Sequence, residues 1–192
     1  MMTDTHYPQL GRSTPVWFSL LAVLLLGGCA SMGPNGSSNR SQAFTANGQT
    51  YVDPTALNAL SNEVLIRAIG LVGTPYRHGG NTPSAGFDCS GLVGFVFLDA
   101  AGLRLPRSTR ELIEIDAPGI EHDNLQPGDL VFFNPGGGKT SHIGIYVGEG
   151  RFVHAPSSGG TVRLDVLESD YWKRSYMGAK RVLRQGARPE PR

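Results

Sequence analysis

The chain has little cysteine, little net charge and no long apolar run. Its 192 residues include two cysteines, Cys29 and Cys89, and the formal net charge is +1. No stretch reaches the roughly 20 apolar residues that a transmembrane helix needs, and a near-neutral charge offers no electrostatic attraction for nucleic acid. Internal repeats, metal-spaced Cys/His clusters and glycine-rich phosphate loops are also missing. We therefore expect no nucleic-acid partner.

The longest apolar run, residues 16–26, has the length of the hydrophobic part of a signal peptide. The sequence LGGC that follows, ending at Cys29, resembles the lipobox of bacterial lipoproteins. The resemblance implies a signal peptide over residues 1–28, a diacylglycerol on the Cys29 sulfur and an acylated new amino terminus. Ala30, instead of aspartate, resembles the pattern of lipoproteins sorted to the outer membrane. The alternative is an ordinary secretory signal with an incidental cysteine.

The composition then divides the rest of the chain into a tether, one domain and a tail. Residues 31–49 are rich in Gly, Ser and Asn, so we expect residues 29–50 to form a lipidated start and a flexible tether. Residues 184–192 are expected to be a disordered tail. The domain, residues 51–183, is long enough to bury a core.

Helical signals dominate the first half of this domain. Asp53 and Pro54 are typical of a helix start, and apolar residues at helical spacing continue to a stop at Gly73. Ser61 could instead begin a separate second helix. Another helix is predicted over residues 89–101, before a terminating glycine.

A short third helix and a series of strands complete the pattern. Ser108 and Glu111 form a capping box at the start of that helix. Strands separated by Gly, Pro and Ser are predicted over residues 128–133, 141–148, 151–155, 161–166 and 176–183. Helices followed by antiparallel strands predict an α+β fold.

Cys89 lies in the first turn of the predicted second helix. With Cys29 lipidated, Cys89 would be an unpaired thiol in an oxidising compartment, where cysteines are usually paired. It is either a small buried hydrophobe or a nucleophile. A helix N-terminus lowers the pKa of a thiol, and its free N–H groups can hold an oxyanion. These features favour a nucleophile, which needs a base.

Two histidines on neighbouring strands are candidates for that base. With a three-residue turn over residues 148–150, Gly144 lies opposite His154, so His154 becomes the diagonal neighbour of His142 on one face. Gly144 would then leave open space beside both. A two-residue turn would place them on opposite faces. A lone strand histidine is usually structural, but this pair favours Cys–His catalysis with a third group that orients the base.

The sequence at these residues resembles the NlpC/P60 family of cysteine peptidases. The motifs FDCSGLV, SHIGIYVG and RFVHA carry the resemblance, together with GTPYRHGG, LPRSTRE and QPGDLVFF between them. They cover about residues 61–183. The resemblance implies a papain-like fold with N-terminal helices packed on an antiparallel sheet. It also implies that the substrate is the stem peptides of bacterial peptidoglycan. The N-terminal lipid would hold the enzyme on the membrane, next to this substrate.

The resemblance assigns roles to three residues: Cys89 is the nucleophile, His142 the general base, and His154 the residue that orients the His142 ring. The implied reaction is acyl transfer, either from a neutral pair or from a resting ion pair, and it implies no metal or organic cofactor. A different Cys–His amidase or acyltransferase on the same fold is one alternative. A non-catalytic wall-binding module is another, although it would not need all three residues.

Further residues match the family less specifically. Tyr76 matches a tyrosine near the nucleophile, and Asp88 and Ser90 match positions that line the substrate cleft. Each also has a structural interpretation: Tyr76 as loop packing and Asp88 as the helix N-cap. His78 stands where the family often has an aromatic residue, and we interpret it as a turn residue. We expect Arg107 to pair with a nearby carboxylate or carbonyl.

Overall fold

The computed structural model describes residues 43–46, 49–158 and 160–184. The predicted signal peptide, Cys29 and most of the predicted tail lie outside these residues. Within them, no helix combines the length and the apolar character needed to cross a membrane.

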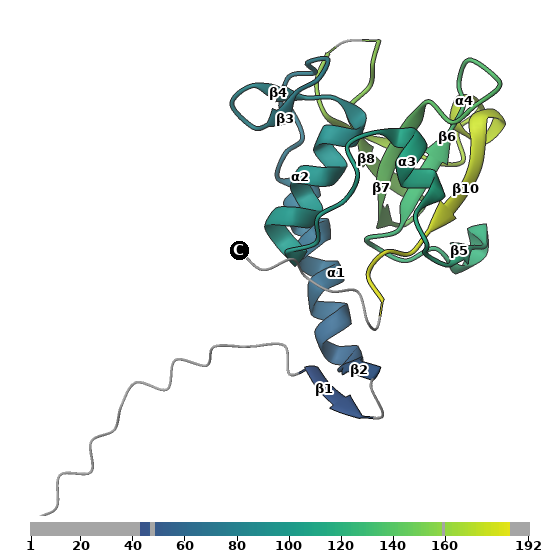
Figure 1. Cartoon of the computed structure of the whole chain (residues 1–192). Coiled ribbons are helices and arrows are strands. Elements are labelled where there is room, and N and C mark those ends of the chain that lie inside the picture. The colour runs from purple at the N-terminus through teal and green to yellow at the C-terminus, as the bar shows by residue number, and fades with distance from the viewer. Residues whose placement is uncertain (1–42, 47–48, 159, 185–192) are drawn as a thin grey trace, which may run out of the picture. The chain divides into compact units, whose positions relative to one another are not determined.

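The described residues form helices and short strands in the order shown in Figure 1. The α-helices are α1 Pro54–Ile69, α2 Cys89–Ala101, α3 Thr109–Glu114 and α4 Asp170–Ser175. A 3-10 helix covers His122–Asn124. The strands are β1 Ala43–Ala46, β2 Gln49–Val52, β3 Asn81–Thr82, β4 Gly86–Phe87, β5 Gly119–Ile120, β6 Leu130–Phe133, β7 His142–Gly148, β8 Arg151–His154, β9 Arg163–Val166 and β10 Tyr176–Lys180.

Helix α1 begins where the sequence predicts and ends earlier. The Asp53 side chain accepts a hydrogen bond from the N–H of Thr55 at 2.8 Å, which caps the helix. The helix continues through Ser61 without a break, so no separate helix starts there. It ends at Ile69 because the following residues turn away, and the N–H of Gly73 bonds to the Val162 carbonyl at 2.9 Å.

The caps of α2 and α3 are confirmed. Asp88 accepts from the N–H of Gly91 at 2.7 Å, and the chain leaves α2 through Gly102 in the left-handed conformation. Ser108 accepts from the N–H of Glu111 at 3.2 Å and donates to its carboxylate at 2.7 Å. Both ends of α2 are therefore fixed by local sequence.

The main sheet has six antiparallel strands in the order β5-β10-β6-β7-β8-β9. Helices α1 and α2 pack on one face, where Val64, Leu92 and Val96 join Ile143 and Ile145 in the larger core cluster (Figure 1). The opposite face carries a second, aromatic cluster that includes Phe133, Tyr146, Phe152 and Trp172. The predicted α+β fold with N-terminal helices on an antiparallel sheet is confirmed.

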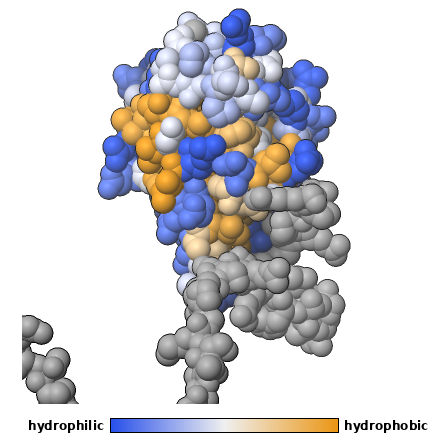
Figure 2. Space-filling view, turned by 90° about the vertical axis from the view of Figure 1, so that its left-hand side faces the viewer, coloured by the Kyte–Doolittle hydropathy of each residue, from blue (hydrophilic) through white to orange (hydrophobic). Residues whose placement is uncertain are grey.

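The side of α1 and α2 turned away from the sheet is only partly polar. Ile66 and Ile69 of α1 and Leu98 of α2 are each at least 40% exposed. Figure 2 looks onto this side of the molecule and shows hydrophobic patches interrupted by hydrophilic side chains.

Some elements were not predicted. Strands β1 and β2 pair with each other, so the last part of the stretch expected to be a tether contains a two-stranded sheet. Strands β3 and β4 pair within the loop that precedes α2. Helix α4 interrupts the segment between β9 and β10, and β10 ends at Lys180 instead of residue 183.

Candidate active site

Cys89 is the first residue of α2 and is partly buried. The loop before it lies directly on the start of the helix: a Cβ on Gly91 would come within 2.1 Å of the Gly80 carbonyl oxygen. Only glycine fits at that contact. The Cys89 sulfur lies 3.6 Å from the Thr109 hydroxyl.

The pKa of Cys89 shifts opposite to the expectation from its helix position. Burial raises the pKa above its ordinary value, and the neighbouring Asp88 raises it further. The hydrogen bonds from Thr109, Ser90 and Ile143 lower it, but by less. The free protein therefore holds a protonated thiol at neutral pH, because desolvation outweighs the donors at the helix N-terminus.

The β7–β8 connection differs from the predicted three-residue turn. Gly148 pairs with Arg151, so the turn contains two residues, Glu149 and Gly150, both with positive φ. An irregularity between Tyr146 and Gly148 shifts the register by one residue, and Ile145 then pairs with Val153. This β-bulge restores the alignment that a three-residue turn would give.

The two histidines consequently share one face, as predicted, although for a different reason. The register brings Gly144 opposite His154. The space beside Gly144 is not open: a Cβ there would lie 2.5 Å from a ring carbon of Phe152. Glycine at this position lets the Phe152 ring pack flat against the strand.

The imidazoles are in direct contact, with His142 Nε2 2.8 Å from His154 Nδ1. His142 is 5% exposed and His154 is fully buried. Burial lowers the pKa of His142 to about 3, helped by the nearby His154 and Arg163. Burial likewise lowers the pKa of His154 to about 4, against the opposing effect of Asp165. Both rings are neutral at pH 7.

A carboxylate behind His154 was missed from the sequence. Asp165 Oδ2 lies 3.0 Å from His154 Nε2 and also accepts from Trp172 Nε1 at 2.9 Å. Two nitrogens of Arg163 bond to the same oxygen at 3.1 and 3.0 Å. Since β9 pairs His154 with Arg163, Asp165 is the diagonal neighbour of His154. His142, His154 and Asp165 thus form a diagonal row across β7, β8 and β9.

Trp172, from the unpredicted helix α4, packs on both imidazoles. Its ring stacks on His142 at a centroid distance of 5.4 Å and an interplanar angle of 21°. It meets His154 edge-on at 4.9 Å. The indole therefore shields both imidazole rings from solvent. It also donates its N–H to Asp165.

Asp88 and Ser90 are held by internal bonds. Asp88 Oδ1 and Oδ2 accept from two nitrogens of Arg107 at 2.7 and 2.9 Å, and Oδ2 also accepts from the N–H of Gly79 at 2.9 Å. Ser90 is buried and bonds to Asp88 and Arg107. The expected pairing of Arg107 is confirmed, and it also reaches the Gly80 carbonyl at 3.1 Å.

Tyr76 and His78 lie on the loop before β3. Burial raises the pKa of the Tyr76 phenol, and the charges of Cys89 and Asp88 raise it further. Residue 76 also forms a parallel bridge with Phe87. His78 is exposed, which agrees with a turn residue.

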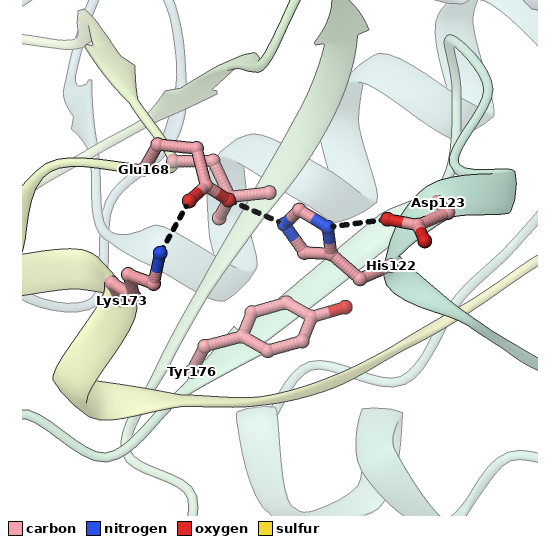
Figure 3. Close-up of a pocket in the computed structure, with 6 residues that line it drawn as sticks. His122, Asp123, Glu168, Lys173 and Tyr176 are labelled. Atoms are coloured by element: carbon pink, nitrogen blue, oxygen red, sulfur yellow. Dashed lines mark hydrogen bonds and ion pairs between the residues drawn. The ribbon is translucent and has the colours of Figure 1, made fainter.

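A cavity of about 360 Å³ opens beside His142. Its walls include Pro135, Arg163, Tyr171 and Trp172. A larger cavity, of about 550 Å³, shares no lining residue with it and is shown in Figure 3. There the Glu168 carboxylate is paired with His122 at 2.8 Å and with Lys173 at 2.9 Å, so its charges are already matched.

Among residues 43–46, 49–158 and 160–184, no group of three or more His, Cys, Asp or Glu side chains is arranged to hold a metal ion.

Comparison with known proteins supports the family resemblance. The family model described as NlpC/P60 matches residues 73–181. The chain belongs to the NlpC/P60 family. It is similar to murein DD-endopeptidase MepH of Escherichia coli K12, at 46% identity over 114 residues that make up 58% of this chain and 42% of MepH.

Two further similarities agree. Murein DD-endopeptidase MepS/murein LD-carboxypeptidase of Escherichia coli K12 is 44% identical over 58% of this chain and 57% of its own length. The crystal structure of an NlpC/P60 family protein from Bacillus cereus ATCC 10987 superposes with a TM-score of 0.59 and 28% identity, covering 65% of this chain and 40% of that one. The similarity to MepH and MepS thus spans less than two thirds of either relative.

Proposed function

We propose that this NlpC/P60 protein is a cysteine endopeptidase that hydrolyses amide bonds in peptidoglycan stem peptides or their cross-links. One observation carries the proposal: His142 Nε2 lies 2.8 Å from His154 Nδ1, so a second, buried imidazole orients the ring of the proposed base. The backbone of Ile143, the residue directly after His142, is among the groups that lower the pKa of Cys89, which supports a thiol close to the start of β7. The names of MepH and MepS support murein as the substrate.

The proposed reaction starts from a neutral thiol and a neutral imidazole. The raised pKa of Cys89 and the pKa of His142 near 3 support this resting state over an ion pair. His142 takes the thiol proton as the sulfur attacks the amide carbonyl, and an acyl-thioester forms after His142 donates the proton to the leaving amine. Water activated by His142 then hydrolyses the thioester.

The oxyanion of the tetrahedral intermediate would form at the N-terminus of α2. Backbone N–H groups there point out of the helix and favour negative charge. We assign Tyr76 to assist it, since the raised pKa of its phenol keeps the hydroxyl protonated at neutral pH. We assign Asp88 and Ser90 to fixing the loop on which this site depends, since their oxygens already have protein partners.

Incubation of the purified protein with isolated peptidoglycan, followed by mass analysis of the fragments, tests the function. We expect new free amino and carboxyl ends within stem peptides or at cross-links, and none with Cys89→Ala. Cys89→Ala should unfold cooperatively like the wild type, because it removes one small side chain. Cleavage of another amide would favour an amidase or acyltransferase. Binding without cleavage would favour a wall-binding module.

We further propose that Cys29 carries the lipid and anchors the enzyme in the outer membrane, facing the periplasm. The support is the LGGC sequence after an apolar run of signal-peptide length. Cys29→Ser should move the protein from the membrane fraction to the soluble fraction and leave its activity on isolated peptidoglycan intact. A Cys29→Ser protein that stays in the membrane fraction would rule out this anchor.

A further inference from the structure

Asp165 determines the direction of each hydrogen bond in the diagonal row His142–His154–Asp165. Burial raises the pKa of Asp165, but the hydrogen bonds from Trp172 and Arg163 and the contact with His154 outweigh it and lower the pKa overall. Asp165 is therefore ionised at neutral pH, and an ionised carboxylate can only accept hydrogen bonds.

This fixes the proton on each ring in turn. Because Asp165 only accepts, His154 Nε2 at 3.0 Å must carry a hydrogen. A neutral imidazole has one N–H, so His154 Nδ1 has a lone pair. It accepts across the 2.8 Å contact from His142 Nε2, which must therefore carry the hydrogen of that ring. His142 Nδ1 is left unprotonated, as a base requires.

We propose that Asp165 is a positioning residue that sets the tautomers of both histidines and thereby keeps His142 Nδ1 free to accept the thiol proton. The inference rests on the proposed function for its consequence in catalysis, while the tautomers themselves are a property of the free protein. Without an acceptor at Asp165, His154 could carry its hydrogen on Nδ1 and accept through Nε2. His142 would then have to accept at Nε2 and carry its hydrogen on Nδ1.

A purely structural role would explain only part of the geometry. Arg163 is about half exposed, and an ion pair at that depth contributes little to stability. The donors of Arg163, Trp172 and His154 all converge on Oδ2 instead of being shared between the two oxygens. An asparagine would keep its amide oxygen at that point, because its NH₂ group would face the N–H groups of three residues there.

This convergence gives a matched pair of variants. Asp165→Asn retains an acceptor of the same shape, and Asp165→Ala removes it. We expect Asp165→Ala to lower kcat by about 10- to 100-fold with little change in KM, as for other residues that orient a functional imidazole. Asp165→Asn should stay within about threefold of the wild type, since the hydrogen bond to His154 remains. Glu168→Ala, which removes a carboxylate that does not contact the row, is the control and should leave kcat unchanged.

The tautomers can be read directly by nitrogen NMR of protein labelled with ¹⁵N-histidine. In the wild type, Asp165→Asn and Glu168→Ala, the buried rings should each show a protonated Nε2 and a bare Nδ1. In Asp165→Ala, His142 should show a protonated Nδ1 in part or all of the population. His78→Gln and His122→Gln identify the signals of the exposed rings, and thermal unfolding checks that each variant is folded.

A protonated Nδ1 on His154 in the wild type would overturn the proposal. So would wild-type tautomers and kcat in Asp165→Ala, or an Asp165→Asn protein as slow as Asp165→Ala. The spectra need no substrate. A protein that releases no peptidoglycan fragments would therefore count against the proposed function alone, and the tautomers would still decide the role of Asp165.

Discussion

Asp88 and Asp165 both accept hydrogen bonds from an arginine beside the candidate site, yet their other partners differ. Asp88 also accepts from the backbone N–H groups of Gly79 and Gly91. Asp165 also accepts from an imidazole and an indole. The first carboxylate therefore fixes the course of the main chain around Cys89, and the second accepts the protons of side-chain donors. An aspartate–arginine pair alone does not tell which of these a site requires.

The largest effect should come from removing the rings that Asp165 supports. We expect His142→Ala to lose nearly all activity, because it removes the base. His154→Ala should lose about 10²- to 10⁴-fold, mainly in kcat, like orienting residues in comparable triads. His154→Asn or His154→Gln should recover part of this, because an amide can still hydrogen-bond to His142. Wild-type kcat in His154→Ala would show that the orienting role is wrong.

The buried histidine pair and Asp88 should affect the free energy of unfolding in different pH ranges. The pKa values of His142 and His154 are lowered from 6.5 to about 3 and about 4. Below pH 6.5 the unfolded chain therefore takes up protons that the folded protein does not. As the pH is lowered from about 6.5 to 4, the free energy of unfolding should fall by roughly 1 kcal/mol per pH unit for each imidazole.

The Asp88 carboxylate affects the free energy of unfolding at a lower pH than the histidines do. Burial raises the pKa of Asp88, but Arg107 and the backbone N–H groups bonded to it lower it overall to below its ordinary 3.8. Its contribution is thus complete above that value and is lost as the pH falls through the folded-state pKa. Urea unfolding at a series of pH values should show that His154→Gln reduces the slope between pH 6.5 and 4. Asp88→Asn should lower the free energy of unfolding by a constant amount above pH 3.8 and change its slope only below that pH. A flat profile between pH 6.5 and 4 would contradict the burial effect on the imidazoles.

A smaller change is expected from Asp88→Ala at neutral pH. It removes the cap of α2 and leaves Arg107 without its carboxylate, so we expect a loss of about 2 kcal/mol of stability. Asp99→Ala, which breaks an exposed ion pair with Arg67, is the matched control and should cost less than about 1 kcal/mol. Equal urea midpoints for the two variants would mean that the α2 cap contributes no more than a surface pair.

The features that local sequence determines could be predicted. The caps at Asp53, Asp88 and Ser108 and the glycine after α2 act within a few residues of themselves, so their patterns are readable. The motif resemblance predicts Cys89 as the nucleophile, and that role stays a prediction. The family was predicted from the sequence motifs, and the α+β fold from the order of the predicted helices and strands.

The part that depends on contacts between distant segments could not be predicted. Asp165 reaches His154 only because β9 pairs with β8 in one particular register. The connection between them is irregular, so its length does not set that register. Trp172 lies on a six-residue helix whose stability comes from packing on aromatic side chains of the sheet, not from a capping side chain. The pKa of Cys89 was predicted in the wrong direction because burial by the sheet and α3 cannot be read from the helix position alone.

The bulge at Val147 has a consequence for comparing sequences of this kind. Side chains on a strand alternate, so the face of a residue depends on whether its distance from the turn is odd or even. A two-residue turn with one bulge and a three-residue turn without a bulge have the same parity, and both put the two histidines on one side. Deleting Val147 alone would change the parity and put the side chains of His142 and His154 on opposite faces of the sheet. Insertions and deletions in this hairpin should therefore be tolerated in compensating pairs and not singly.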